Sequence, residues 1–135
     1  MNSYKLTETL AVAGQISVAL VADIAAAGYK VLLNNRPDGE ERGQPSSAEI
    51  AAAAEAAGLE YHHMPVTALD FPGDRIDEMA DLFDDEDRPV FAFCRSGTRC
   101  TNLWVVSRQP EERAEAVARA QDIGFDLSMA ARALS

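Results

Sequence analysis

The stretch that decides the fold is PVFAFCRSGTRCTNLW, from Pro89 to Trp104. Its short run of apolar and aromatic residues at 90–93 is typical of a buried parallel strand. Cys94 follows at once, and a polar loop around Gly97 then leads into helical apolar spacing. Because such a loop and a helix N-terminus point their N–H groups at one spot, the pattern predicts an anion-binding loop with Cys94 at its base. We call residues 94–99 the cradle loop.

The cradle loop gives Cys94 a setting in which a thiol becomes reactive. Converging N–H groups can lower a thiol pKa from about 8.5 to roughly 3.5–7.5, which makes the thiolate a nucleophile. Arg99 would close the loop with a permanent, planar positive charge. The alternative is a buried core cysteine followed by arginines on a solvated turn. The complete loop pattern favours the reactive cysteine.

Composition indicates a single domain, residues 1–135, of ordinary globular character, with 47% hydrophobic and 25% charged residues. No segment approaches the roughly 20 apolar residues of a membrane span, and the first ten residues do not resemble a signal peptide, so a cytoplasmic location is expected. A net charge of −10 argues against nucleic acid or an anionic membrane as partner. We therefore expect a small anionic substrate, and homo-oligomer formation is left open.

Periodicity and turn residues divide the chain into alternating strands and helices. Strands are expected at residues 8–13 (an edge strand), 29–33, 59–66 and 90–93. Helices are expected at residues 18–27, 46–57, 74–84, 101–108, 111–121 and 126–133. This order predicts an α/β fold with a mostly parallel sheet flanked by helices in three layers.

Three polar loops follow the inner strands and are expected to meet at one edge of the sheet, where ligands bind in such folds. They are the cradle loop, the long loop at 34–45 and the loop that holds Asp70. Arg36 is expected to line the pocket as a substrate contact.

Three motifs together carry a resemblance to a known family. They are NRPDGE at 35–40, QPS at 44–46 and CRSGTR at 94–99. The chain resembles, over about residues 4–107, the phosphatase-like domain also found fused to metallo-β-lactamase-type hydrolases, the DUF442 group. The resemblance implies a fold similar to dual-specificity protein tyrosine phosphatases. That family has been described both as phosphatase-like and as sulfurtransferase.

Loop length favours sulfurtransferase chemistry. Tyrosine phosphatases carry His-Cys-x5-Arg, whereas here Arg99 comes five positions after Cys94 and Phe93 precedes it. The Cys-x4-Arg spacing is similar to that of rhodaneses, whose shorter loop suits a sulfane sulfur. The expected enzyme is a sulfurtransferase that carries a persulfide on Cys94, taken from thiosulfate or a small persulfide and passed to a thiol or cyanide.

Two alternatives remain open. The first is a phosphatase-like hydrolase with a Cys94 phosphocysteine, in which Asp70, 24 residues before Cys94, would be the general acid. The second is a non-catalytic anion- or redox-sensing module, in which Cys100 would form a disulfide with Cys94. In the resembled family serine usually follows the arginine, so Cys100 is either a resolving thiol or an inert replacement.

The remaining residues of the cradle loop have supporting roles. Ser96, Gly97 and Thr98 are expected to shape the loop and bind the anion, and Arg95 points either outward or toward substrate. No metal or other cofactor is expected, because His62 and His63 are adjacent on a strand and face opposite sides.

Overall fold

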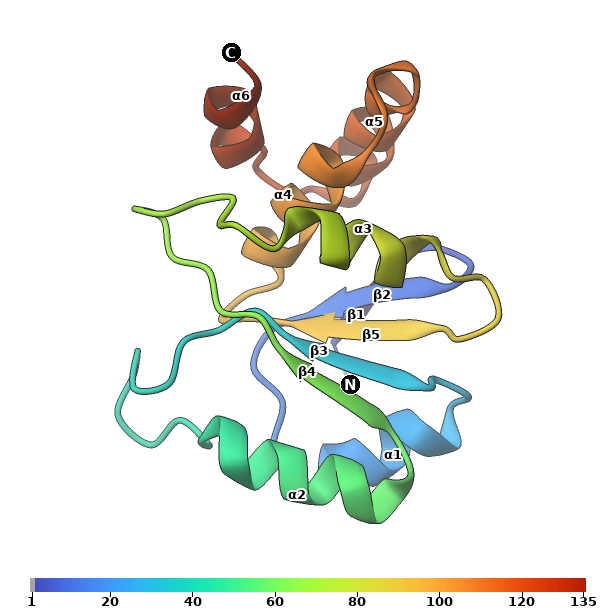
Figure 1. Ribbon diagram of the computed structural model, residues 1–135, viewed down its shortest axis with the longest axis vertical. Coiled ribbons are helices and arrows are strands. Elements are labelled where there is room, and N and C mark those ends of the chain that lie inside the picture. Colours follow the sequence, from blue (N-terminus) through green and yellow to red (C-terminus); the bar gives the residue numbers. More distant parts are fainter. Residues whose placement is uncertain (1) are drawn as a thin grey trace.

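A computed structural model describes residues 2–135, which form one five-stranded sheet between two layers of helices (Figure 1). The strands run in the order β1-β2-β5-β3-β4, with β1 antiparallel to β2 and every other pair parallel. This arrangement confirms the predicted α/β class. The strands are β1 (Ser3–Thr7), β2 (Leu10–Ala13), β3 (Val31–Asn34), β4 (Glu60–His63) and β5 (Val90–Phe93).

The helices divide between the two faces of the sheet (Figure 1). One face carries α1 (Leu20–Ala26) and α2 (Ser47–Ala57). The other carries α3 (Ile76–Asp84), α4 (Thr98–Ser107), α5 (Arg113–Ile123) and α6 (Ser128–Leu134), with a 3-10 turn at Pro110–Glu112 before α5. Among the described residues, no helix is both long enough and apolar enough to cross a membrane.

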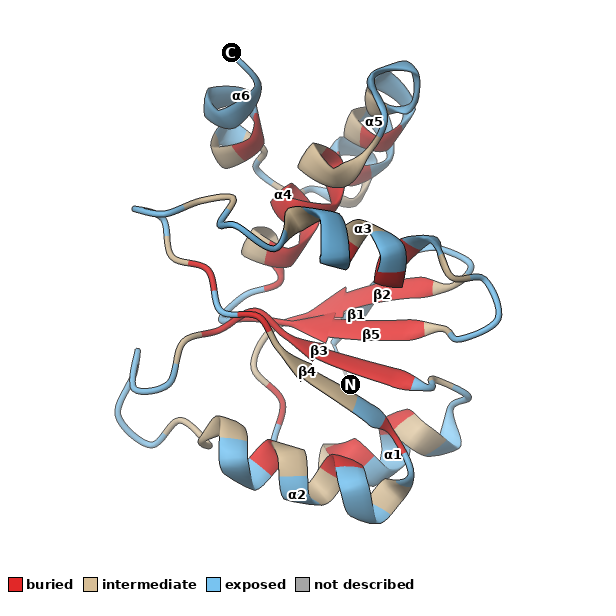
Figure 2. Cartoon of the chain, viewed as in Figure 1, coloured by how far each residue is buried: buried red, intermediate tan, exposed pale blue. Residues whose placement is uncertain are grey.

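The central strand explains why both helical layers stay attached. Val90 and Ala92 of β5 belong to the core under α3 and α4, whereas Phe91 and Phe93 belong to the core under α1 and α2. All four are buried, as are the residues of β2 and β3, which Figure 2 shows in red. A parallel strand covered on both faces reads as a continuous apolar run, and this is the pattern seen at 90–93.

Several boundaries differ from the sequence-based expectation; β4, for example, covers Glu60–His63 where a strand over 59–66 was expected. The strand expected at the edge (8–13) lies inside the sheet as β2, because β1 pairs along its outer side. Only Leu6 of β1 is buried, so that strand carries no apolar run to reveal it. Helix α4 begins at Thr98, three residues earlier than expected. The prediction missed this first turn because it is mostly polar and lacks the apolar spacing of the later turns. The predicted capping box of Ser46 and Glu49 at the start of α2 is confirmed.

The polar loops meet at the carboxyl ends of the parallel strands. The N–H of Asn35 donates to the carbonyl of Phe93 (3.0 Å), and the N–H of Met64 donates to the carbonyl of Asn34 (2.9 Å). These bonds continue the sheet pairing past the strand ends, so the loops after β3, β4 and β5 leave side by side. Because β5 lies between β2 and β3, the cradle loop lies between the segment after β2 and the loop after β3.

Candidate active site

The cradle loop joins β5 to α4 through one left-handed residue. Gly97 has φ 88° and caps the helix. This left-handed conformation is strained for any residue that carries a side chain. A Cβ there would also lie 3.4 Å from the backbone of Ala13. The N–H of Gly97 donates to Sγ of Cys94 at 3.1 Å. The predicted arrangement of a strand end, a tight turn and a helix start is therefore present.

The cradle loop is also bonded to the segment after β2. The N–H of Cys94 donates to the carbonyl of Ala13 (3.2 Å), and the N–H of Gln15 donates to the carbonyl of Arg95 (3.3 Å). Gly14 forms an isolated bridge with Ser96, and a Cβ on Gly14 would lie 3.1 Å from the carbonyl oxygen of Arg95. These contacts fix the loop from its outer side, so its N–H groups stay directed at the sulfur.

Cys94 is almost fully buried, yet its thiol is acidic. Its pKa falls from an ordinary 9.0 to about 6. The largest cause is a hydrogen bond from the Cys100 thiol, and backbone N–H groups of Cys100, Ser96 and Gly97 add to it. Burial acts in the opposite direction, because a charged group is less stable away from water. The donors outweigh burial, so Cys94 is largely a thiolate at neutral pH.

Cys100 is the complementary partner in this pair. It is fully buried in the first turn of α4, and its pKa lies well above the ordinary value because of burial and the neighbouring Cys94 sulfur. It therefore stays protonated, and its S–H lowers the pKa of the neighbouring Cys94. Both cysteines are free thiols.

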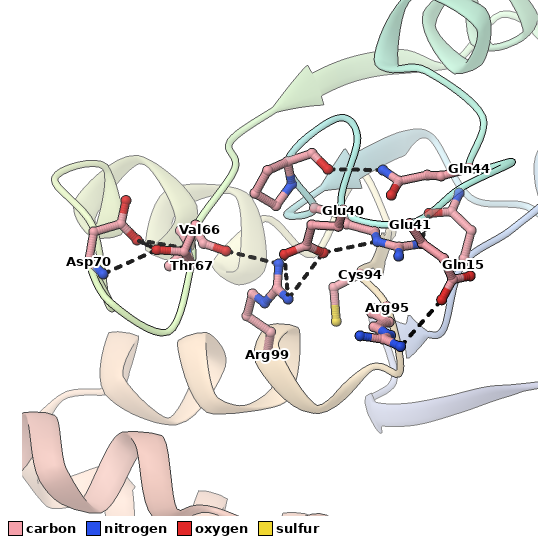
Figure 3. Close-up of polar contacts among 12 residues, drawn as sticks. Gln15, Glu40, Glu41, Gln44, Val66, Thr67, Asp70, Cys94, Arg95 and Arg99 are labelled. Atoms are coloured by element: carbon pink, nitrogen blue, oxygen red, sulfur yellow. Dashed lines mark hydrogen bonds and ion pairs between the residues drawn. The ribbon is translucent and has the colours of Figure 1, made fainter.

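Arg99 leaves the cradle loop and reaches the two neighbouring loops (Figure 3). Its Nη1 donates to the carbonyl of Val66 at 2.9 Å. Its Nη2 donates to both carboxylate oxygens of Glu40, at 3.3 and 3.1 Å. Only 15% of the Arg99 side chain is exposed. The three predicted loops are thus joined through one guanidinium group.

Contrary to expectation, Arg36 is buried behind Glu40 and does not line an open pocket. It is 1% exposed, its Nε donates to Glu40 (3.0 Å), and its Nη1 donates to the side-chain oxygen of Gln15 (3.0 Å). Its Nη2 is buried and has no hydrogen-bond partner among the described residues. The structure therefore brings Arg36 to the site, but its link to Arg99 runs through Glu40.

Asp70 lies in the loop after β4, to the side of the cradle loop (Figure 3). Its Oδ1 accepts hydrogen bonds from the backbone N–H of Thr67 (2.6 Å) and from its hydroxyl (3.0 Å). These bonds lower the pKa of the Asp70 carboxyl. In this arrangement Asp70 stabilises its own loop, and the same loop is tied to Arg99 through Val66.

The outer residues of the cradle loop are exposed. Arg95 points outward and pairs with Glu41 at 3.3 Å, with 65% of its side chain exposed. The hydroxyl of Ser96 bonds that of Thr98 (3.1 Å) across the turn. Among residues 2–135, no cluster of three or more histidine, cysteine, aspartate or glutamate side chains could hold a metal ion.

Sequence reasoning missed Glu40 and Gln15. Glu40 stands in the quoted NRPDGE motif, but it lies in a loop, where the four-residue spacing from Arg36 does not by itself predict an ion pair. Gln15 carried no signal, since it lies in an irregular segment after β2, 21 positions from its partner Arg36.

Comparison with known proteins identifies relatives of this chain. The sequence pattern described as the beta-lactamase hydrolase-like protein, phosphatase-like domain, matches residues 3–111. A beta-lactamase hydrolase-like protein of Agrobacterium fabrum is 34% identical over 98% of this chain, and one of Xylella fastidiosa is 33% identical over 96%. In both cases the match spans 31% of the relative's length.

Solved structures give the same picture. A proposed phosphatase from Neisseria meningitidis has 38% identity and a TM-score of 0.74, with 92% of this chain and 89% of that chain covered. Tk-PTP in its active form has 16% identity and a TM-score of 0.70, with 98% and 92% covered. TpbA of P. aeruginosa in complex with pTyr has 17% identity and a TM-score of 0.65, with 93% and 75% covered. The last two show likeness of fold alone.

These findings overturn the sulfurtransferase interpretation, which is wrong. The matched family is described as phosphatase-like, and the Neisseria meningitidis relative of 38% identity is described as a proposed phosphatase, not a sulfurtransferase. The error came from using the number of residues between Cys94 and Arg99 as a measure of how many N–H groups surround the sulfur. Helix α4 begins at Thr98, and the backbone N–H of Cys100 in its first turn also lowers the pKa of Cys94. The ring of N–H groups therefore extends beyond the residues between Cys94 and Arg99.

The donor set around Cys94 predicts a measurable thiolate titration. The rate of iodoacetamide alkylation of Cys94 against pH should show a midpoint near 6. In Cys100→Ala the largest donor is lost, so the midpoint should move up toward the ordinary thiol value. Cys100→Ser is the matched control, because a hydroxyl still donates. An unchanged midpoint in Cys100→Ala would contradict this assignment.

Proposed function

The chain belongs to the phosphatase-like domain family of beta-lactamase hydrolase-like proteins, and we propose that it hydrolyses phosphate monoesters through a phosphocysteine on Cys94. The observation that carries the proposal is the Cys94 thiolate with a pKa of about 6 at the centre of a ring of N–H donors. Such a ring matches the terminal oxygens of a phosphoryl group, and helix α4 directs its positive end at the same spot.

The first step would be an in-line displacement at phosphorus. Sγ of Cys94 forms the S–P bond while the bond from phosphorus to the ester oxygen breaks, and the electron pair leaves with that oxygen. The N–H groups of the cradle loop and the Arg99 guanidinium would stabilise the charge on the equatorial oxygens. In the second step water attacks phosphorus, the S–P bond breaks, and inorganic phosphate and the thiolate are released.

Asp70 is the residue we propose as proton donor to the leaving oxygen. Its loop is tied to the cradle loop by the bond from Arg99 to the carbonyl of Val66. Thr67 occupies Oδ1, which leaves Oδ2 to carry the proton. Because the pKa of Asp70 is lowered, only a small fraction is protonated near neutral pH. An acidic optimum follows.

Hydrolysis of para-nitrophenyl phosphate tests the proposed reaction. The wild-type protein should release phosphate with a rate that saturates with substrate, and Cys94→Ser should fall to background because it lacks the nucleophile. Cys100→Ser, which keeps a donor to Cys94, is the matched control and should remain active. Turnover that persists in Cys94→Ser would overturn the proposal.

The pH dependence of Asp70→Asn tests the proton donor. With phenyl phosphate, whose leaving group needs a proton, kcat/KM of the variant should be about 10²-fold below wild type near pH 6. As the pH rises above 6, Cys94 becomes more fully ionised in both proteins while the protonated fraction of Asp70 keeps declining, so the ratio of wild type to variant should shrink. The ionisation of phenyl phosphate changes with pH in the same way for both proteins, so it cancels in the ratio. A ratio that does not change with pH would exclude Asp70 as the acid.

A further inference from the structure

We propose that Glu40 is a positioning residue that holds the Arg99 guanidinium in the orientation needed to bind a phosphoryl group. The inference rests on the proposed function and assigns a role that neither the motif nor the comparisons give. Glu40 lies between two guanidinium groups (Figure 3). Its Oε1 accepts from Nε of Arg36 (3.0 Å) and from Nη2 of Arg99 (3.3 Å), and its Oε2 accepts from Nη2 of Arg99 (3.1 Å).

The pairing differs from an ordinary surface ion pair, because its members are shielded from water. The side chains of Arg36, Arg99 and Glu40 are 2%, 15% and 24% exposed. Exposed ion pairs contribute little because water and salt screen them, whereas shielded pairs are screened less. The hydrogen bonds from Arg36 and Arg99 lower the pKa of Glu40 despite the opposing effect of burial. Glu40 therefore stays ionised and keeps both contacts.

Arg36 supplies the rigid side of this arrangement. Its backbone N–H donates to the side-chain oxygen of Asn34 (2.8 Å), and a ring nitrogen of His63 bonds its carbonyl (2.8 Å). Its Nη1 is held by Gln15 (3.0 Å), and its Nη2 has no partner among residues 2–135. A buried cation with an unpaired donor is costly, so the ion pair with Glu40 is the main compensation for its charge. Arg36 thus fixes the carboxylate that Arg99 contacts.

Arg99 is held at its terminal nitrogens only. Nη1 bonds Val66 and Nη2 bonds Glu40, while Nε makes no hydrogen bond within the described part of the chain. The guanidinium group is planar and rigid, so fixing two nitrogens also fixes the direction of the third. The N–H on Nε therefore remains for a substrate oxygen. A guanidinium oriented in advance loses less entropy when the phosphoryl group arrives.

A competing role for Glu40 would be to occupy Arg99 in place of the substrate. The two roles predict opposite effects of Glu40→Gln on anion binding. Removal of a negative charge beside an anion site strengthens anion binding by simple electrostatics, and removal of a competitor strengthens it further. Only the loss of positioning weakens it. The sign of the change therefore separates the roles.

The test is the dissociation constant of tungstate, measured by calorimetry on the full chain, together with kcat/KM for para-nitrophenyl phosphate. Glu40→Gln should weaken tungstate binding and lower kcat/KM, each on the order of tenfold, and Glu40→Asp should recover part of both. Glu41→Gln is the matched control, because it removes the same charge at the next position in the chain. Glu41 pairs with the exposed Arg95 and not with Arg99. The Glu41→Gln variant should stay within about twofold of wild type.

Each outcome decides the inference separately from the proposed function. Unchanged or tighter tungstate binding by Glu40→Gln overturns the positioning role, even if wild type hydrolyses the ester. Weaker binding by Glu40→Gln in a protein that hydrolyses no ester upholds the positioning role and overturns the phosphatase. No tungstate binding by wild type overturns both. If Glu40→Gln does not fold, Glu40→Asp binding as tightly as wild type or more tightly overturns the positioning role, and weaker binding upholds it.

Discussion

The site depends on the hydrogen bonds that converge on the Cys94 sulfur. Burial alone would keep this thiol protonated, and the donors from Cys100, Ser96 and Gly97 reverse that effect. The donors are in place because β5 ends at Phe93 and α4 begins at Thr98, with the left-handed Gly97 between them. The three-layer fold therefore serves the site by holding a strand end and a helix start in a fixed relation.

The electrostatics of the protein follow from the same geometry. The chain carries a net charge of −10, yet its cradle loop is bordered by arginines. Arg36 and Arg99 share Glu40, and Arg95 pairs with Glu41, so each cation is held by a carboxylate of a single loop. Fixed cations and N–H dipoles in a shielded site act more strongly than the same charges in water. A local anion site can thus exist on an acidic protein.

The sequence predicted the parts of the structure that local patterns encode. The strand at 90–93 and the capping box at Ser46 follow from apolar runs and side-chain spacing, and both are confirmed. Strand β1 was missed because it buries only Leu6. The reaction was mispredicted because the loop was treated as a string of residues, whereas the donors come from α4 as well. The contact of Arg99 with Glu40 joins residues 59 positions apart, and no local pattern reveals it.

The most direct test of the central claim is mass spectrometry of the Cys94 peptide after rapid acid quench of the protein with para-nitrophenyl phosphate. The account predicts the added mass of one phosphoryl group on Cys94 during turnover, and none on Cys94→Ser. Turnover with Cys94 unmodified, or with the phosphoryl group on another residue, would contradict it.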